Sequence, residues 1–145
     1  MIMEKIEDVL FYTIDKSIKT YRQYAQKKLI SAGHSITIDQ WLVLTVLKDY
    51  PEISQSEIAD KVFKDNASVT RIIELLVKSN LLKRSVQSQD RRRTNISITT
   101  KGEKSLVEVK QIVLNNRKNA LRGISKDEIK LLNTLLNKII TNCFE

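Results

Sequence analysis

The 145-residue sequence predicts one mainly α-helical domain that carries a helix-turn-helix and a small β-hairpin. Only three Gly and one Pro are available for turns, which favours helices over many strands. Apolar residues recur at steps of three or four along most of the chain, and four of these stripes begin beside a capping-box pattern. Alternation of apolar and polar residues, which indicates strands, is confined to the segment after Asn80.

The first element is a long amphipathic helix that ends at residues 31–33, Ser-Ala-Gly. Its apolar face consists of residues three or four positions apart: Ile6, Leu10, Ile14, Ile18, Tyr21, Ala25 and Leu29. Tyr12, Tyr21 and Tyr24 lie on this helix and offer one possible wall of a ligand cavity. Because aromatic residues on a helix are usually packed against neighbours, we expect them to serve packing instead.

The second element is a short, strongly buried helix. The capping box of Thr37 with Gln40 opens it. It ends before Tyr50-Pro51, because proline disfavours helical geometry in the residue that precedes it. Trp41 lies in the apolar stripe of this helix, so we expect it in the core. Ile53 alone is expected to form a one-residue strand.

From residue 54 the pattern is helix, tight connection, helix, which is typical of a helix-turn-helix. Ser54 and Glu57 form the capping box of the first helix. The connection covers about residues 63–65, and either Asp65 or Asn66 can cap the second helix. The inner faces of the two helices consist of Ile58, Ala59 and Val62, and of Val69, Ile72, Ile73, Leu76 and Val77.

After Asn80 the period changes to that of a two-stranded hairpin. Apolar residues alternate with polar ones over residues 82–86 and again at Ile96 and Ile98, and residues 87–93 are expected to form a long, basic tip. Two further helices are expected at about residues 101–122 and 126–142. Their capping boxes are Thr100 with Glu103, and Ser125 with Glu128.

Positive charge is concentrated in the helix-turn-helix and the hairpin. The chain has 25 Lys and Arg against 17 Asp and Glu, a net charge of +8. Residues 64–104 hold ten basic and four acidic residues and so carry six of the eight excess charges. A basic patch on a helix-turn-helix is typical of a DNA-binding protein, because neutralised phosphates release counterions. Charge runs are often only solvated loops, but the position of this one favours DNA binding.

Enzymatic and metal-binding functions are not predicted. The sequence has one His and one Cys, and it lacks the common nucleotide, zinc and nucleophile motifs, so we expect no enzyme activity, cofactor or metal. His34 is expected at the surface, and a sensing role for it or for Cys143 is not determined by the sequence. The acidic N-terminus and the absence of a long apolar run predict a cytoplasmic protein without a membrane partner.

Residues 90–102, Asp-Arg-Arg-Arg-Thr-Asn-Ile-Ser-Ile-Thr-Thr-Lys-Gly, resemble the wing signature of the MarR (multiple antibiotic resistance regulator) family. Residues 67–71 resemble that family's recognition helix, and residues 80–84 resemble the segment that leads into its wing. Two positions depart from the pattern. Phe63 occupies a turn position where such motifs often have Gly, and Asn80 replaces the usual Gly after the recognition helix, although Asn tolerates left-handed geometry.

The resemblance implies a dimeric winged helix-turn-helix repressor or activator of transcription. Residues 37–100 would form the DNA-binding lobe, and residues 1–33 and 101–145 would form the dimerisation region. It also implies a small-molecule effector site between these two parts. The C-terminal apolar stripe agrees with a partner surface, with packing inside one chain as the alternative: Ile124, Ile129, Leu132, Leu136, Ile139 and Ile140.

The predicted site is a surface for double-stranded DNA. The recognition helix would enter the major groove with the residues of its N-terminal turns, Ala67, Ser68, Thr70 and Arg71. Arg92 would enter the minor groove, with Asp90 fixing its orientation, while Arg91 and Arg93 would contact phosphates. A homodimer would then bind a pseudo-palindromic operator. The alternative is a winged-helix module for protein interaction that lacks sequence-specific DNA binding.

Overall fold

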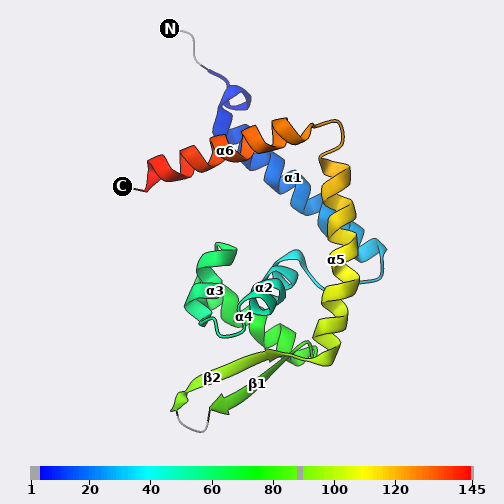
Figure 1. Ribbon diagram of the computed structural model, residues 1–145, viewed down its shortest axis with the longest axis vertical. Coiled ribbons are helices and arrows are strands. Elements are labelled where there is room, and N and C mark those ends of the chain that lie inside the picture. Colours follow the sequence, from blue (N-terminus) through cyan, green and yellow to red (C-terminus); the bar gives the residue numbers. More distant parts are fainter. Residues whose placement is uncertain (1–3, 88–89, 145) are drawn as a thin grey trace.

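The computed structural model describes the backbone of residues 4–87 and 90–144, and the side chains of these residues except 86–94. Helices α1, α5 and α6 form an arc, and α2, α3, α4 and the hairpin form a lobe at one end of it (Figure 1). Both chain termini lie at the far end of the arc from the hairpin (Figure 1). The elements are η1 (Ile6–Asp8), α1 (Leu10–Ser31), α2 (Ile38–Asp49), α3 (Gln55–Val62), α4 (Asn66–Lys78), β1 (Leu82–Gln87), β2 (Asp90–Ile98), α5 (Thr100–Ala120) and α6 (Lys126–Cys143).

The hydrophobic core lies inside the lobe and extends to the arc. Helix α2 is its centre, with Trp41 buried as predicted. Helices α3 and α4 bury the apolar faces that the sequence predicted, through residues such as Ile58 and Ile73. Leu29 of α1 and Val109 of α5 complete this core. The lobe is therefore joined to the two long helices by packing as well as by the chain.

Three of the four predicted capping boxes are confirmed, at Thr37, Ser54 and Ser125. The fourth is wrong, because Thr99 and not Thr100 caps α5. The Thr99 hydroxyl accepts from the Gly102 amide at 3.0 Å and donates to the Asn80 carbonyl at 2.6 Å, while the Thr99 amide donates to the carbonyl of Leu81. These bonds to the start of the hairpin keep Thr99 extended, and the helix begins at Thr100, one residue earlier than predicted.

The hairpin is confirmed, but its predicted long tip is not. Strands β1 and β2 pair antiparallel from Leu82 with Ile98 to Val86 with Thr94, and the register then shifts so that Gln87 pairs with Asp90. Residues 90–93 therefore belong to β2, and residues 91–93 are the extra residues of an irregularity in the ladder. Such a bulge breaks the two-residue period of a strand. The alternation of apolar and polar residues therefore did not predict this part of β2.

Ile53 is not a strand, which corrects the prediction. Its amide donates to the Tyr50 carbonyl at 3.1 Å in the turn after α2, and its side chain packs on the core. Within the part of the chain that the structure describes, the hairpin is a two-stranded sheet. None of the helices described for residues 4–144 is both long and apolar enough to span a lipid bilayer.

Candidate nucleic-acid interface

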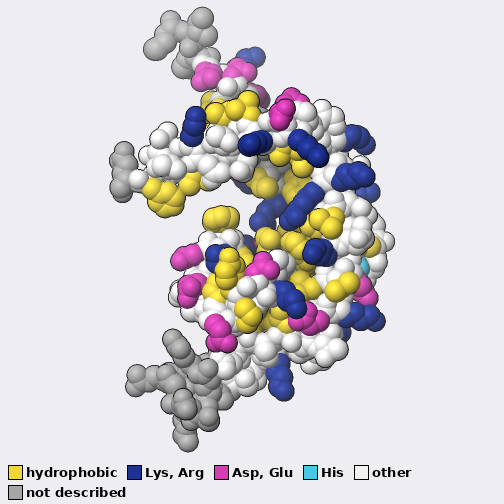
Figure 2. Space-filling view, viewed as in Figure 1, with side chains coloured by type: hydrophobic (Ala, Val, Ile, Leu, Met, Phe, Trp, Pro, Cys, Tyr) yellow, Lys and Arg dark blue, Asp and Glu magenta, His cyan; other side chains and the backbone are white. Residues whose placement is uncertain are grey.

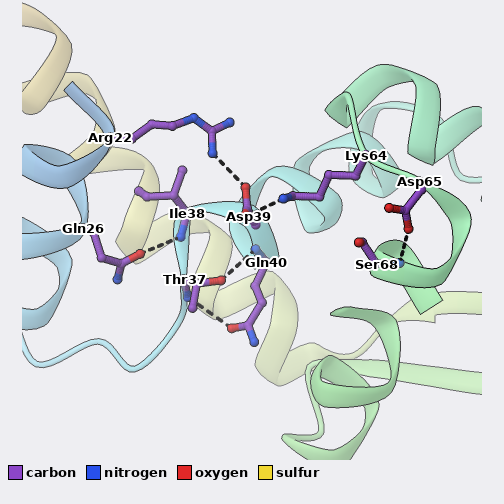
Figure 3. Close-up of polar contacts among 9 residues, drawn as sticks. All are labelled: Arg22, Gln26, Thr37, Ile38, Asp39, Gln40, Lys64, Asp65 and Ser68. Carbon is purple, nitrogen blue, oxygen red and sulfur yellow. Dashed lines mark hydrogen bonds and ion pairs between the residues drawn. The ribbon is translucent and has the colours of Figure 1, made fainter. Parts of the chain in front are cut away.

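A tight turn sets the angle between α3 and α4. Helix α3 ends in a Schellman motif, in which the amide of Lys64 donates to the carbonyl of Ala59 at 3.0 Å. The left-handed residue of this motif is Phe63, with φ 58° and ψ 43°. Asp65 then caps α4 by accepting a hydrogen bond of 2.7 Å from the Ser68 amide (Figure 3). The predicted connection is confirmed, and of the two predicted caps the structure selects Asp65.

The Asp65 carboxylate also places negative charge at the N-terminus of α4. The backbone hydrogen bond from Ser68 is the largest cause that lowers the pKa of Asp65 below its ordinary value. The carboxylate is therefore ionised at neutral pH and suits the positive end of the helix dipole. It fixes the first turn of α4, which carries the residues expected to contact DNA.

The predicted recognition residues lie together on the outer side of the first two turns of α4. Ala67 and Arg71 are exposed, and Ser68 and Thr70 are half-buried. The opposite side of α4 is buried in the core through Val69, Ile73 and Leu76. Core packing thus fixes the buried side of α4 and leaves its N-terminal turns available to a ligand.

Gln55 is a polar neighbour of the recognition helix that the sequence did not identify. It is the first residue of α3, and its Nε2 donates to Thr70 Oγ1 at 2.5 Å and to the Asn66 carbonyl at 3.4 Å. The Thr70 hydroxyl in turn donates to the same Asn66 carbonyl at 2.9 Å. A glutamine after an N-cap is unremarkable in sequence, and only the crossing of the two helices brings it to Thr70.

The wing is anchored at its base to α4 and α5. Asn80 adopts the left-handed geometry that the sequence predicted it would tolerate, with φ 63°. Gly102 lies so close to the hairpin that a Cβ there would be 2.3 Å from the Leu81 carbonyl oxygen and 2.7 Å from Ile98 Cγ2. This close approach explains why a wing of this kind ends at a glycine.

Exposed basic residues lie on α4, at Arg71 and Lys78, and on β1, at Lys83 and Arg84. The backbone of Asp90, Arg91, Arg92 and Arg93 lies in β2, but their side chains fall outside the described residues. The pairing of Asp90 with Arg92 and the DNA contacts of the three arginines therefore stay predictions.

A polar network links the arc to the turn before the recognition helix. Asp39, in the first turn of α2, accepts from Arg22 of α1 at 2.9 Å, and its second oxygen lies 3.2 Å from Lys64 Nζ (Figure 3). Burial alone would raise the pKa of Asp39, but the hydrogen bonds and charges of Arg22 and Lys64 outweigh it and lower the pKa. The same α1 face supplies Gln26, which accepts from the Ile38 amide at 3.0 Å.

The terminal helices expose a large apolar surface. Helix α6 buries none of its side chains against the described chain, and Leu131, Leu132, Leu135 and Ile140 are each about half exposed. Leu10 and Phe11 of α1 are also exposed. Figure 2 shows hydrophobic side chains gathered on the hollow side of the molecule, between the terminal helices and the lobe.

Helix α4, held at its N-terminus by a capped turn and flanked by a hairpin anchored at its base, defines a winged helix-turn-helix protein. Residues 36–94 match the model of the MarR family. Over these residues the match agrees with the resemblance to the MarR family that the wing residues predicted.

Solved structures share this fold over nearly the whole chain. A protein of unknown function from Listeria innocua is 27% identical, with a TM-score of 0.69, and the match covers 92% of this chain and 91% of that one. The S. aureus MepR–DNA complex has a TM-score of 0.80 at 24% identity, covering 95% and 99%. Bordetella bronchiseptica BpsR, whose DNA binding is regulated by 6-hydroxynicotinic acid, has a TM-score of 0.84 at 20% identity, covering 94% and 96%.

Proposed function

We propose that this protein is a sequence-specific DNA-binding regulator that binds pseudo-palindromic operators as a homodimer and acts as a ligand-responsive repressor. The observation that carries the proposal is the exposed N-terminal end of α4. Asp65 caps this end, and the opposite side of the helix is packed in the core. In helix-turn-helix proteins this end of the second helix contacts base edges in the major groove.

The DNA contacts are divided between the helix and the wing. Ala67, Ser68, Thr70 and Arg71 contact the major groove, and Arg91, Arg92 and Arg93 of the wing contact the flanking minor groove and phosphates. The net charge of +8 supplies the attraction to phosphate. MepR, which shares this fold, was solved in complex with DNA, and this supports the same ligand here.

Dimerisation rests on the apolar surface of the terminal helices. Isolated amphipathic helices are marginal in water, and α6 has no buried side chain within the described chain. A second copy that covers α6 and the start of α1 provides the missing packing and a two-fold axis. BpsR supports the effector part of the proposal, since its DNA binding responds to a small aromatic acid.

Selection from a library of random DNA duplexes tests the function. We expect enrichment of a pseudo-palindrome with half-site centres about 10 base pairs apart, or a multiple of that spacing. Binding without any enriched sequence, or no binding at physiological salt, would contradict the proposal. The second of these results would favour a winged-helix module for protein interaction.

An arginine substitution then tests the recognition helix. Arg71→Ala should weaken binding to the selected operator by roughly 1–3 kcal/mol, the value of a good arginine contact to guanine. Arg117→Ala, which changes an exposed arginine of α5, is the matched control and should have a small effect. Equal affinity of the Arg71→Ala variant and the unchanged protein would show that Arg71 does not contact the operator.

A further inference from the structure

The hydrogen bonds around Thr70 fix which kind of group its hydroxyl can still bind. The hydroxyl has one proton and two lone pairs. Since a carbonyl oxygen can only accept, the 2.9 Å bond to the Asn66 carbonyl must use the Thr70 proton. The bond from Gln55 Nε2 then occupies one lone pair. The Thr70 hydroxyl is left with one lone pair and can only accept.

The same reasoning fixes the orientation of the Gln55 amide. Its nitrogen, and not its oxygen, must face the Asn66 carbonyl and Thr70, because an amide oxygen there would oppose an acceptor on one side and find no proton on the other. Both Gln55 N–H groups are thereby directed at Asn66 and Thr70. The remaining oxygen, Gln55 Oε1, can only accept.

We infer that Gln55 and Thr70 act as one unit that recognises the exocyclic amino group of adenine or cytosine in the major groove. In that groove adenine N6 and cytosine N4 are donors, whereas guanine O6 and N7 and thymine O4 are acceptors. A unit that presents only acceptors therefore selects an amino base over a keto base on one strand. This inference rests on the proposed function, and it makes Gln55 a specificity-determining residue of α3.

Gln55 and Thr70 are not suited to binding the phosphates of DNA. Phosphate oxygens are acceptors, so a unit without an available proton gains nothing from the DNA backbone. Gln55 and Thr70 therefore contribute to the choice of sequence and not to general affinity. Their loss should leave binding to unrelated DNA unchanged.

Selection from random duplexes with the unchanged protein and three variants tests the inference. In sites selected by the unchanged protein, one position of each half-site, read on one strand, should favour A or C over G or T. The preference should be about fivefold or more, which is the effect of one mismatched base pair. Thr70→Val removes the hydroxyl at nearly constant shape, and Gln55→Ala removes the amide. Each should abolish the preference at that position alone, and the double variant should lose no more there than Thr70→Val does.

Two kinds of control keep the result specific. Thr70→Ser retains the hydroxyl and should retain the preference. Thr134→Val removes a hydroxyl that bonds to the carbonyl four residues earlier in α6, at 2.9 Å, and Gln111→Ala removes an exposed glutamine of α5. Neither of these two should change any position. Thermal unfolding of each variant shows that the lobe is folded.

The outcomes separate this inference from the function on which it depends. If the unchanged protein enriches an operator but Thr70→Val and Gln55→Ala keep every base preference, the inference is wrong and the proposed function stands. The same holds if the position they affect favours A and T over G and C, because a unit that recognises an amino group on one strand should distinguish A from T there. If the unchanged protein enriches no sequence, the proposed function fails and the inference fails with it.

Discussion

Phe63 combines two unfavourable properties at the turn of the helix-turn-helix. Its φ of 58° lies in the left-handed region, which is unfavourable for a phenylalanine, and its side chain is 91% exposed. The sequence marks this position as unusual because such turns often hold Gly. It does not reveal whether the turn changes shape or the residue accepts strain. The structure shows that the Schellman motif is kept and that Phe63 itself adopts the left-handed conformation.

Replacing Phe63 by Gly should therefore stabilise the protein. The left-handed conformation costs a non-glycine residue about 1–2 kcal/mol, while the greater freedom of Gly in the unfolded chain offsets part of the gain. We expect a net increase of up to about 1 kcal/mol in the free energy of unfolding, measured by urea denaturation. Asn80→Gly, at φ 63°, is the control and should gain less, because Asn tolerates this conformation. A less stable Phe63→Gly protein would mean that the ring contributes more than the strain costs.

Residues that act through a long-range contact were the hardest to predict. Asp65 was one of two predicted caps, because a cap bonds within the first helical turn, and its partner Ser68 is three residues away. Gln55 was missed because its partner Thr70 is 15 residues away on another helix. Local spacing predicts hydrogen bonds within a helix turn, and it does not predict those that depend on how two helices cross.

At the scale of elements, sequence predicted the helices well and the hairpin less well. Helix starts are local, since a cap and an apolar stripe define them, and three capping boxes were correct for that reason. The start of α5 was misplaced because Thr99 is held by the carbonyl of Asn80, which lies 19 residues earlier in the chain. The extent of β2 was misjudged because the register shift opposite Val86 breaks the alternation.

The ion pairs of Asp39 join α1 and α2 to the turn before α4, so they hold the lobe against the arc. Their loss in Asp39→Asn should lower the free energy of unfolding by roughly 0.5–1 kcal/mol at pH 7, since the side chains are partly exposed and screened by solvent. Denaturation over a pH series measures this. Asp15→Asn, which breaks the exposed pair of Asp15 with Lys19, is the control and should have a smaller effect.

The pH dependence of this difference has a definite sign. The pKa of Asp39 is lower in the folded protein than in the unfolded chain, so its ionised form stabilises the fold at neutral pH. That contribution is present above the ordinary aspartate pKa and is lost as the pH falls through the lowered value. The difference between the unchanged protein and Asp39→Asn should therefore shrink below about pH 4. A constant difference down to pH 2 would show that charge is not its source.

At the scale of the whole molecule, the exposed face of α6 predicts the assembly. Light scattering should give about twice the 16.8 kDa mass of one chain at micromolar concentration. Leu132→Asp places a charge on the apolar face and should shift the protein toward the monomer, with weaker operator binding. Asn133→Asp, on the polar side of the same helix, should leave the dimer intact. A monomeric mass for the unchanged protein would contradict the account.

In the proposed complex, two copies of the lobe bind one face of a DNA duplex with α4 in successive major grooves. The most direct test measures the affinity of the protein for its selected operator before and after five base pairs are inserted between the half-sites. Five base pairs are about half a helical turn, so the insertion places the half-sites on opposite faces of the duplex. We predict that affinity falls to the level of unrelated DNA. Unchanged affinity after the insertion would contradict the account.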